Sequence, residues 1–234
     1  MLSKLLEYPN DVIRLFYPRL CGGCEMALNK GEQHLCVHCR LDLPFTTFEN
    51  MRGNPVEKIF YGRVPLEFAT SFLSFSKSSK VQNMMHAIKY QERKELALFL
   101  GRLFGQRLQN NPYLQSVTTL MPVPLHPQKQ QLRGFNQSEL FAEGINETLQ
   151  LEISKDNLIR PLQTSSQTKK TRIERWENVE HAFEIKHPKI LQNKHILLID
   201  DVLTTGATLE ACAQSILDKV DCKISVATIA FAMH

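Results

Sequence analysis

Short apolar runs alternate along most of the chain with segments in which apolar residues recur at helical spacing. The runs that predict strands are 68–75, 117–124, 181–185, 196–199 and 223–232. The segments that predict helices are 80–90, 95–108, 135–149 and 207–220. Strands that alternate with helices predict an α/β domain with a parallel, doubly wound sheet. Ligands of such sheets bind at the carboxyl ends of the strands.

The pattern is different before residue 66. Residues 1–20 predict an amphipathic helix, and the acids Glu7 and Asp11 and the lack of a small-residue cleavage site argue against a signal peptide. Residues 51–65 hold two Pro and two Gly, which favours a linker or partner-facing loop. We therefore expect a leading helix and small module over 1–50, a linker over 51–65, and the α/β domain over 66–234.

The aliphatic run 196–199 is followed by Asp200 and Asp201 and then by a Thr-Thr-Gly-Ala-Thr turn at 204–208. Such a run is typical of a strand buried on both faces, so both carboxylates are expected at its carboxyl end. Gly206 lets the backbone approach a ligand closely. The free N–H groups at the next helix start, with the threonine hydroxyls, make a phosphate site.

Carboxylates beside a phosphate site suit hydroxyl donors, which they bind directly or through a magnesium ion. Adjacent hydroxyls next to a phosphate describe a ribose 5-phosphate, which is the ligand that this turn predicts. The alternative is an ordinary capping turn beside two solvated acids.

Four of the six cysteines fall within 19 residues, as two Cys-x2-Cys pairs separated by eleven residues. This spacing is typical of a closed structural zinc site with four thiolate ligands. The predicted ligands are Cys21, Cys24, Cys36 and Cys39. His34 and His38 are alternative ligands, and an empty or redox-active site is the competing interpretation. The spacing leaves open whether the module contacts nucleic acid, docks a partner or only staples the chain.

Composition adds little to this picture. The chain has 234 residues, of which 43% are hydrophobic and 22% charged, as is usual for globular proteins. The net charge of +4 is too small to argue for nucleic acid by itself. No apolar run approaches the length of a membrane span, so a cytoplasmic protein that does not span the membrane is expected.

Residues 196–208 resemble the phosphoribosyl-pyrophosphate (PRPP) signature of type I phosphoribosyltransferases. Three further segments extend the likeness: AIKYQERKELALFLGRLF (87–104), MPVPLHPQKQQLRGFNQSELFA (121–142) and RPLQTSSQTKKTRIERWENVEHAFEI (160–185). With the cysteine-rich amino end, they resemble the ComF family of competence-associated, phosphoribosyltransferase-like proteins. The resemblance covers nearly the whole chain. It implies a type I phosphoribosyltransferase-like parallel sheet flanked by helices, with a small N-terminal zinc module.

The resemblance also implies a binding site for PRPP, with magnesium on its diphosphate and ribose hydroxyls. The implied PRPP-binding residues are Asp200, Asp201, Val202, Leu203, Thr204, Thr205, Gly206, Ala207, Thr208, Lys129 and Arg133. In the family's relatives a segment equivalent to the loop 163–178 closes over the reacting centre, where basic residues would stabilise the departing diphosphate. The implied catalytic residues are Asp200, Asp201, Lys169, Lys170 and Arg172.

Plainer interpretations compete with these assignments. The loops 125–133 and 163–178 could be solvated basic surface loops, and the cluster Lys89, Arg93 and Lys94 could be a solvated helix end. No segment resembles a dedicated nucleobase pocket. Two functions therefore stay open. One is phosphoribosyl transfer to an unknown acceptor. The other is a non-catalytic, PRPP-regulated module that handles single-stranded DNA, since the family's association with DNA uptake implies single strands and uptake machinery as partners.

Overall fold

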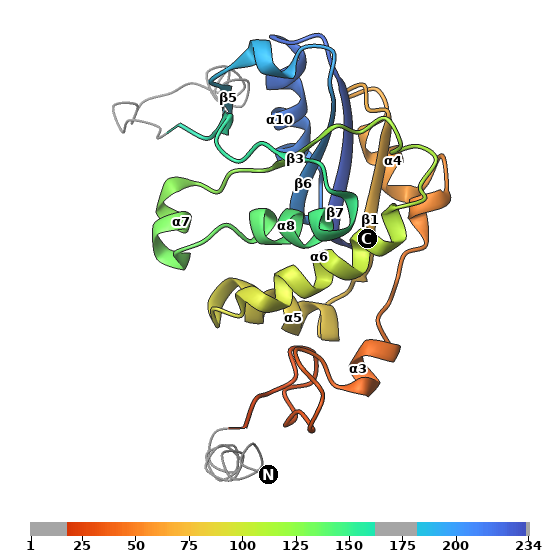
Figure 1. The fold of residues 1–234 in the computed structure, drawn as a ribbon, viewed down its shortest axis with the longest axis vertical. Helices are drawn as coiled ribbons and strands as arrows, with labels where there is room; N and C mark the ends of the chain where they lie inside the picture. The colour runs from red at the N-terminus through yellow and green to blue at the C-terminus, as the bar shows by residue number, and fades with distance from the viewer. Residues whose placement is uncertain (1–17, 162–181, 233–234) are drawn as a thin grey trace, which may run out of the picture.

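The computed structural model describes residues 18–161 and 182–232 (Figure 1). Most of the leading helix expected over 1–20 therefore lies outside the described residues. The basic residues Lys169, Lys170 and Arg172 lie outside them entirely. No described helix is long and apolar enough to cross a membrane.

The expected parallel sheet is confirmed. Five strands pair in the order β1-β7-β6-β2-β3, and every pair is parallel. The strands are β1 (Phe68–Phe75), β2 (Thr119–Pro122), β3 (Glu152–Ile153), β6 (His195–Leu203) and β7 (Lys223–Ala232). Residues 196–199 of β6 are completely buried. They alternate between the two core clusters, because successive side chains of a strand point to opposite faces.

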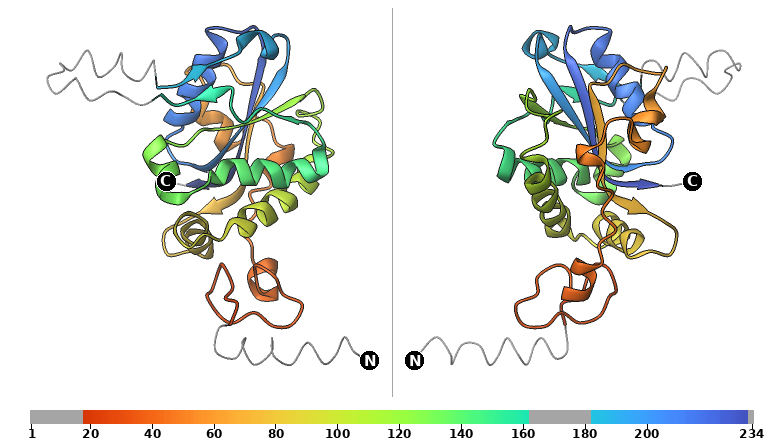
Figure 2. Two further views of the ribbon diagram at one scale, coloured as in Figure 1. Left: turned by 60° about the vertical axis from the view of Figure 1, so that its left-hand side comes forward. Right: turned by 90° about the vertical axis from the view of Figure 1, so that its right-hand side faces the viewer.

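Helices cover both faces of the sheet (Figures 1 and 2). One core cluster joins the sheet to α5 (Lys80–Tyr90), α6 (Lys94–Leu108) and α8 (Gln137–Leu149). The other joins it to α4 (Pro55–Phe60) and α10 (Ala207–Leu217). The predicted helix 80–90 is confirmed at both ends, and the other three differ by no more than three residues at either end.

Two sequence expectations around the candidate site need correction. The strand predicted over 196–199 continues to Leu203, because β6 keeps pairing with β7 as far as Leu203 and Phe231. The segment 125–133 is not an open loop, since Pro127–Arg133 forms the exposed helix α7, with Pro127 in its first turn. Both aspartates consequently lie within the last four residues of the strand.

The remaining elements are short. They are α3 (Val37–Leu41), the 3-10 turns η1 (Phe48–Asn50) and η2 (Pro188–Leu191), and the antiparallel pair β4 (Leu158–Ile159) and β5 (Glu184–Ile185). Figure 2 shows the cysteine-rich segment and α3 beneath the α/β body, on the side of α5 and α6.

Residues 51–65, expected as a linker, contain the packed helix α4. The Asn54 side chain accepts hydrogen bonds from the backbone N–H groups of Val56 (2.9 Å) and Glu57 (3.0 Å), so it caps the helix start. Val56 and Phe60 are buried against the sheet. An Asn followed by Pro and, three residues on, by Glu is a helix-start signal that the Pro and Gly content obscured.

Candidate ligand site at the end of strand β6

The Asp201 carboxylate is fully engaged by donors of the chain itself. Its Oδ1 accepts a hydrogen bond from the backbone N–H of Val202 at 2.5 Å. Its Oδ2 accepts from Gln137 Nε2 at 2.6 Å and lies 2.8 Å from Lys89 Nζ. Since Asp201 is 9% exposed, these partners compensate for its removal from water.

Asp200 is arranged differently. Its Oδ1 accepts hydrogen bonds from Ser138 Oγ at 3.1 Å and from the backbone N–H of Asp201 at 2.8 Å. Within residues 18–161 and 182–232, its Oδ2 has no hydrogen-bond partner. Burial, followed by the neighbouring Asp201 charge, raises the pKa of the Asp200 carboxyl to about 7. Asp200 is therefore the carboxyl with an oxygen available to a ligand.

A small hollow follows the two aspartates. It is lined by Asp200 and by residues 202–209, but not by Asp201. Thr204, Thr205 and Thr208 are exposed, and Gly206 is the N-cap of α10. The N-cap has no side-chain hydrogen bond to the helix, and the Ala207 N–H donates only a long bond, of 3.5 Å, to Thr205 Oγ1. N–H groups of the first turn therefore stay available to an anion. The strand, the turn and the helix start thus place a free carboxylate oxygen beside an anion-binding turn.

Helix α4 supports this turn from behind. Gly206 has φ +79°, and a Cβ added there would lie 2.7 Å from Ile59 Cγ2 and 3.1 Å from Phe60 Cε1. Arg63, just after α4, donates a hydrogen bond from Nη1 to the carbonyl oxygen of Thr205 at 2.7 Å and forms an ion pair with Glu210 of α10. Residues that are distant in the chain thus hold the turn in its conformation. Arg63 and Glu210, for example, are 147 positions apart.

The basic residues predicted to face the crevice are placed unequally. Arg133 donates from Nη1 to Gln137 Oε1 at 3.0 Å, and its guanidinium lies 5.4 Å from the centre of the Tyr90 ring. Through Gln137 it therefore joins the network around Asp201. Lys129 is exposed on α7, and its side chain makes no hydrogen bond or ion pair in the described part of the chain.

The cluster Lys89, Arg93 and Lys94 separates in the fold. Lys89 reaches Asp201, as described above. Arg93 donates a hydrogen bond to the carbonyl oxygen of Leu20 in the cysteine-rich segment, and Lys94 lies 5.1 Å from the centre of the Phe135 ring. Only Lys89 therefore belongs to the candidate site, and sequence reasoning had no signal that distinguished it from its neighbours.

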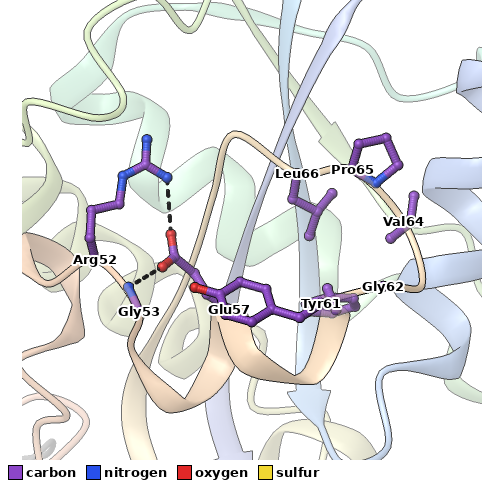
Figure 3. A pocket seen from close by; sticks show the side chains of 9 residues that line it. Arg52, Gly53, Glu57, Tyr61, Gly62, Val64, Pro65 and Leu66 are labelled. Carbon is purple, nitrogen blue, oxygen red and sulfur yellow. Dashed lines mark hydrogen bonds and ion pairs between the residues drawn. The ribbon is translucent and has the colours of Figure 1, made fainter.

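A second, larger hollow of about 310 Å³ lies beside α4 (Figure 3). It is lined only by residues of the segment 52–66 and contains none of the predicted site residues. Its charged groups are already paired, because Glu57 accepts hydrogen bonds from Arg52 Nη1 at 3.2 Å and from the backbone N–H of Gly53. We therefore place the candidate ligand site at β6 and not here.

The four cysteines come together beside helix α5, where Gly23 contacts Asn83 and Cys21 shares a hollow with Ala87. Their sulfur atoms all lie within 4.8 Å of one another, and Cys24 Sγ is 3.8 Å from Cys36 Sγ. A tetrahedral zinc ion with bonds of about 2.3 Å separates its sulfur ligands by about 3.8 Å. The cluster therefore has the size of a structural metal site such as that of zinc.

Backbone donors point at these sulfurs. Cys21 Sγ accepts from the N–H groups of Gly23 (3.4 Å) and Cys36 (3.3 Å), and Cys36 Sγ accepts from Cys39 N–H (3.4 Å). Although burial opposes ionisation, backbone hydrogen bonds led by that from Cys36 lower the pKa of the Cys21 thiol to about 6. Such donors are suited to the thiolate form that a metal requires.

The alternative ligands do not join this cluster. Within the described residues, the group that could hold a metal consists of the four cysteines alone. The ring of His34 instead packs against Phe99, with 5.3 Å between ring centres. All six cysteines are free thiols in the structure.

Comparison with known proteins agrees with this architecture. Residues 149–234 match the family model of the phosphoribosyl transferase domain. Competence protein ComFC of Bacillus subtilis is 39% identical over 201 residues, covering 86% of this chain and 79% of that protein. Competence protein F of Haemophilus influenzae is 31% identical, covering 81% and 80%. DNA utilization protein YhgH of Escherichia coli is 27% identical, covering 87% and 92%.

Among solved structures, adenine phosphoribosyltransferase from Leishmania tarentolae is 13% identical in sequence and has a TM-score of 0.38. The superposition covers 77% of this chain and 89% of that structure's chain. The assignment rests instead on the competence proteins, on the parallel sheet with its Asp-Asp and Thr-Thr-Gly-Ala-Thr segment, and on the four-cysteine cluster. The chain belongs to the ComF family of competence-associated, phosphoribosyltransferase-like proteins.

Proposed function

We propose that the turn after β6 binds PRPP and that the protein transfers its phosphoribosyl group to an acceptor during DNA uptake. The observation that carries the proposal is Asp200 Oδ2, which has no hydrogen-bond partner among the described residues and lies beside the start of α10, where the N-cap makes no side-chain hydrogen bond. A phosphate in the turn 204–208 and a ribose hydroxyl at Asp200 use both features together.

The two aspartates then have different roles. Asp200 accepts a hydrogen bond from a ribose hydroxyl through Oδ2. Asp201, whose two oxygens are already bonded to Val202, Gln137 and Lys89, holds the strand end and the start of α8 in register. Sequence reasoning assigned both carboxylates to the ribose, so this division is a refinement that the contacts favour.

In the transfer, the bond between the anomeric carbon and the diphosphate oxygen breaks, and that oxygen keeps the electron pair. A new bond forms between the anomeric carbon and the acceptor, whose proton goes to solvent. Arg133, Lys129 and the basic residues Lys169, Lys170 and Arg172 would compensate the charge of the leaving diphosphate. Magnesium bound to the diphosphate would supply further charge neutralisation.

A second candidate function is a non-catalytic module that handles single-stranded DNA under the control of PRPP. The observation that favours it is the 61% exposed Tyr90 beside Arg133, which is hydrogen-bonded to Gln137 of the candidate site. Exposed aromatic rings next to basic side chains bind single strands by stacking and phosphate contact. The relatives named competence proteins support a place in DNA uptake for either function.

Titration calorimetry with magnesium and PRPP tests the binding proposal. We expect the wild type to bind and Asp200→Asn to lose most of the affinity. The control Asp156→Asn, which changes an exposed aspartate outside the candidate site, should bind like the wild type. Absence of binding to folded, zinc-loaded wild type would overturn the proposal.

Diphosphate release distinguishes the two functions. An enzyme releases diphosphate from PRPP when the correct acceptor is supplied, and Asp200→Asn should abolish this release. A DNA-handling module releases none, yet binds single-stranded DNA with an affinity that falls with salt and with removal of Lys169, Lys170 and Arg172. Screening free bases and single strands as acceptors therefore decides between them.

A further inference from the structure

We propose that the four-cysteine module controls the candidate PRPP site through helix α5, by positioning Lys89 against Asp201. The inference rests on the proposed function, but its structural part can be measured without PRPP. It identifies Lys89 as a positioning residue and gives the module a role beyond holding its own fold together.

The four-cysteine module contacts the start of α5. Asp42 forms an ion pair with Lys80, the first residue of the helix. The carbonyl oxygen of Gly23, which lies between two of the cysteines, accepts a hydrogen bond from Asn83 Nδ2 at 2.9 Å. The module thus contacts both the first residue and the second turn of the helix.

Packing makes this contact close. Gly22 and Gly23 bring the backbone against the helices, since a Cβ at Gly22 would lie 2.6 Å from Leu96 Cδ2 and one at Gly23 3.6 Å from Lys80 Cβ. Cys21 and Cys39 are buried in the core cluster that also contains α5. Because the cysteines belong to this core, the geometry that a metal gives them also determines where α5 can lie.

The other end of α5 reaches the candidate site. Lys89 lies in the last turn, about 14 Å along the helix from Lys80 at about 1.5 Å per residue. Its Nζ is 2.8 Å from Asp201 Oδ2, and both side chains are largely buried, with 21% and 13% exposed. A helix transmits a displacement along its axis because its backbone hydrogen bonds resist stretching. Loss of the contacts at Lys80 and Asn83 therefore moves Lys89 relative to Asp201.

Lys89 matters because, among the described residues, the Asp201 carboxylate has two other partners, the Val202 N–H and Gln137. Without Lys89, the negative charges of Asp200 and Asp201 lie beside each other with less compensation, and a bound diphosphate adds further negative charge. Ligand affinity should therefore depend on Lys89 although the lysine is bonded to the protein and not to the ligand.

A double-mutant cycle tests the coupling. The seat variant Lys80→Ala/Asn83→Ala removes the ion pair with Asp42 and the hydrogen bond to Gly23 at the start of α5, but leaves the cysteines and the Arg93–Leu20 hydrogen bond. Lys89→Met removes the ammonium group. We expect each to weaken binding of magnesium-PRPP by about tenfold, which is within the usual range of coupled sites. Combined, they should weaken it little further, since both act through the same pair. Lys219→Met, which removes an exposed lysine beyond α10, is the matched control and should bind like the wild type.

A second measurement needs no PRPP. In protein labelled with carbon-13 at aspartate, the Asp201 Cγ resonance should move in the seat variant and after zinc removal toward its position in Lys89→Met. Zinc removal from Lys89→Met itself should leave the resonance nearly unchanged. Circular dichroism and metal analysis establish that the variants are folded and that the seat variant keeps its metal.

The two measurements separate this inference from the proposed function. The inference would be overturned if the seat variant kept the wild-type Asp201 resonance. It would also be overturned if the losses of affinity in the seat variant and in Lys89→Met added in full when the two were combined. Neither outcome affects the proposal that the protein binds PRPP. Wild type that binds no PRPP would overturn the proposed function, and the resonance of Asp201 would still decide whether the module acts on the site.

Discussion

Gly206 and Ile59 lie so close together that a single methyl group cannot be added between them, since a Cβ on Gly206 would be 2.7 Å from Ile59 Cγ2. This contact joins the turn that makes the candidate phosphate site to helix α4, which precedes it by almost 150 residues. The turn is thus shaped by its neighbours in the fold as much as by its own threonines and glycine.

The first prediction concerns this contact. Gly206→Ala should destabilise the protein by about 1–3 kcal/mol and weaken PRPP binding, because the new Cβ meets α4 and the residue has φ +79°. Chemical denaturation and calorimetry measure the two effects. The double variant Gly206→Ala/Ile59→Ala relieves the clash with Ile59 but neither the close contact with Phe60 nor the backbone strain, so it should recover part of the binding. No recovery at all would assign the whole effect to the backbone.

Arg63 is predicted to hold the turn in its binding conformation. Arg63→Met removes the hydrogen bond to the carbonyl oxygen of Thr205 and the ion pair with Glu210, so PRPP affinity should fall several-fold. The stability change should stay below about 1 kcal/mol, because the pair is about one-third exposed. Arg102→Met, which breaks a similar surface pair with Glu147 between α6 and α8, is the matched control. Equal loss of affinity in both variants would contradict a specific role for Arg63.

Stability should depend on pH through Asp200. Its carboxyl has a pKa of about 7 in the folded protein, and the unfolded value is near 3.8. Between about pH 4 and pH 7 the folded protein keeps a proton that the unfolded chain has lost. The free energy of unfolding therefore falls as the pH rises across this window and is level above it.

Denaturant titrations of the wild type and Asp200→Asn from pH 4 to pH 8 measure this dependence. The asparagine cannot ionise, so the stability difference between the two proteins should change steadily up to about pH 7. Carboxyl groups that do not interact with Asp200 affect both proteins alike and cancel in that difference. A difference that is constant across the range would show that Asp200 titrates at its ordinary pKa.

Zinc is predicted to be bound at about one ion per chain and to be needed for the module's structure. Cys39→Ser should lose the metal and lower the unfolding temperature, because Cys39 is both a proposed ligand and a buried core residue. Cys222→Ser, outside the cluster and only partly buried, should keep the metal. Metal analysis with thermal unfolding makes the comparison, and well under one zinc in freshly prepared wild type would contradict the prediction.

Much of the fold follows from local pattern. The strands β1 and β7 and the helices α5 and α8 were predictable within a few residues, because each buries a face whose period is visible in neighbouring positions. Helix α4 was missed because Pro55 and Gly62 resemble loop punctuation, although Asn54 and Glu57 mark a helix start. Helix α7 was missed because it is short, exposed and lacks an apolar face.

The candidate site divides in the same way. Asp200, Gly206 and the threonines are contiguous, so their strand, turn and helix start are recognisable in the printed chain, and the paired cysteine spacing predicts their cluster. No local pattern states that Lys89 meets Asp201, that Arg63 holds Thr205, or that Asp200 keeps a free oxygen while Asp201 does not. Those relationships depend on how distant segments pack around the sheet, and packing is a property of the whole fold and not of adjacent residues.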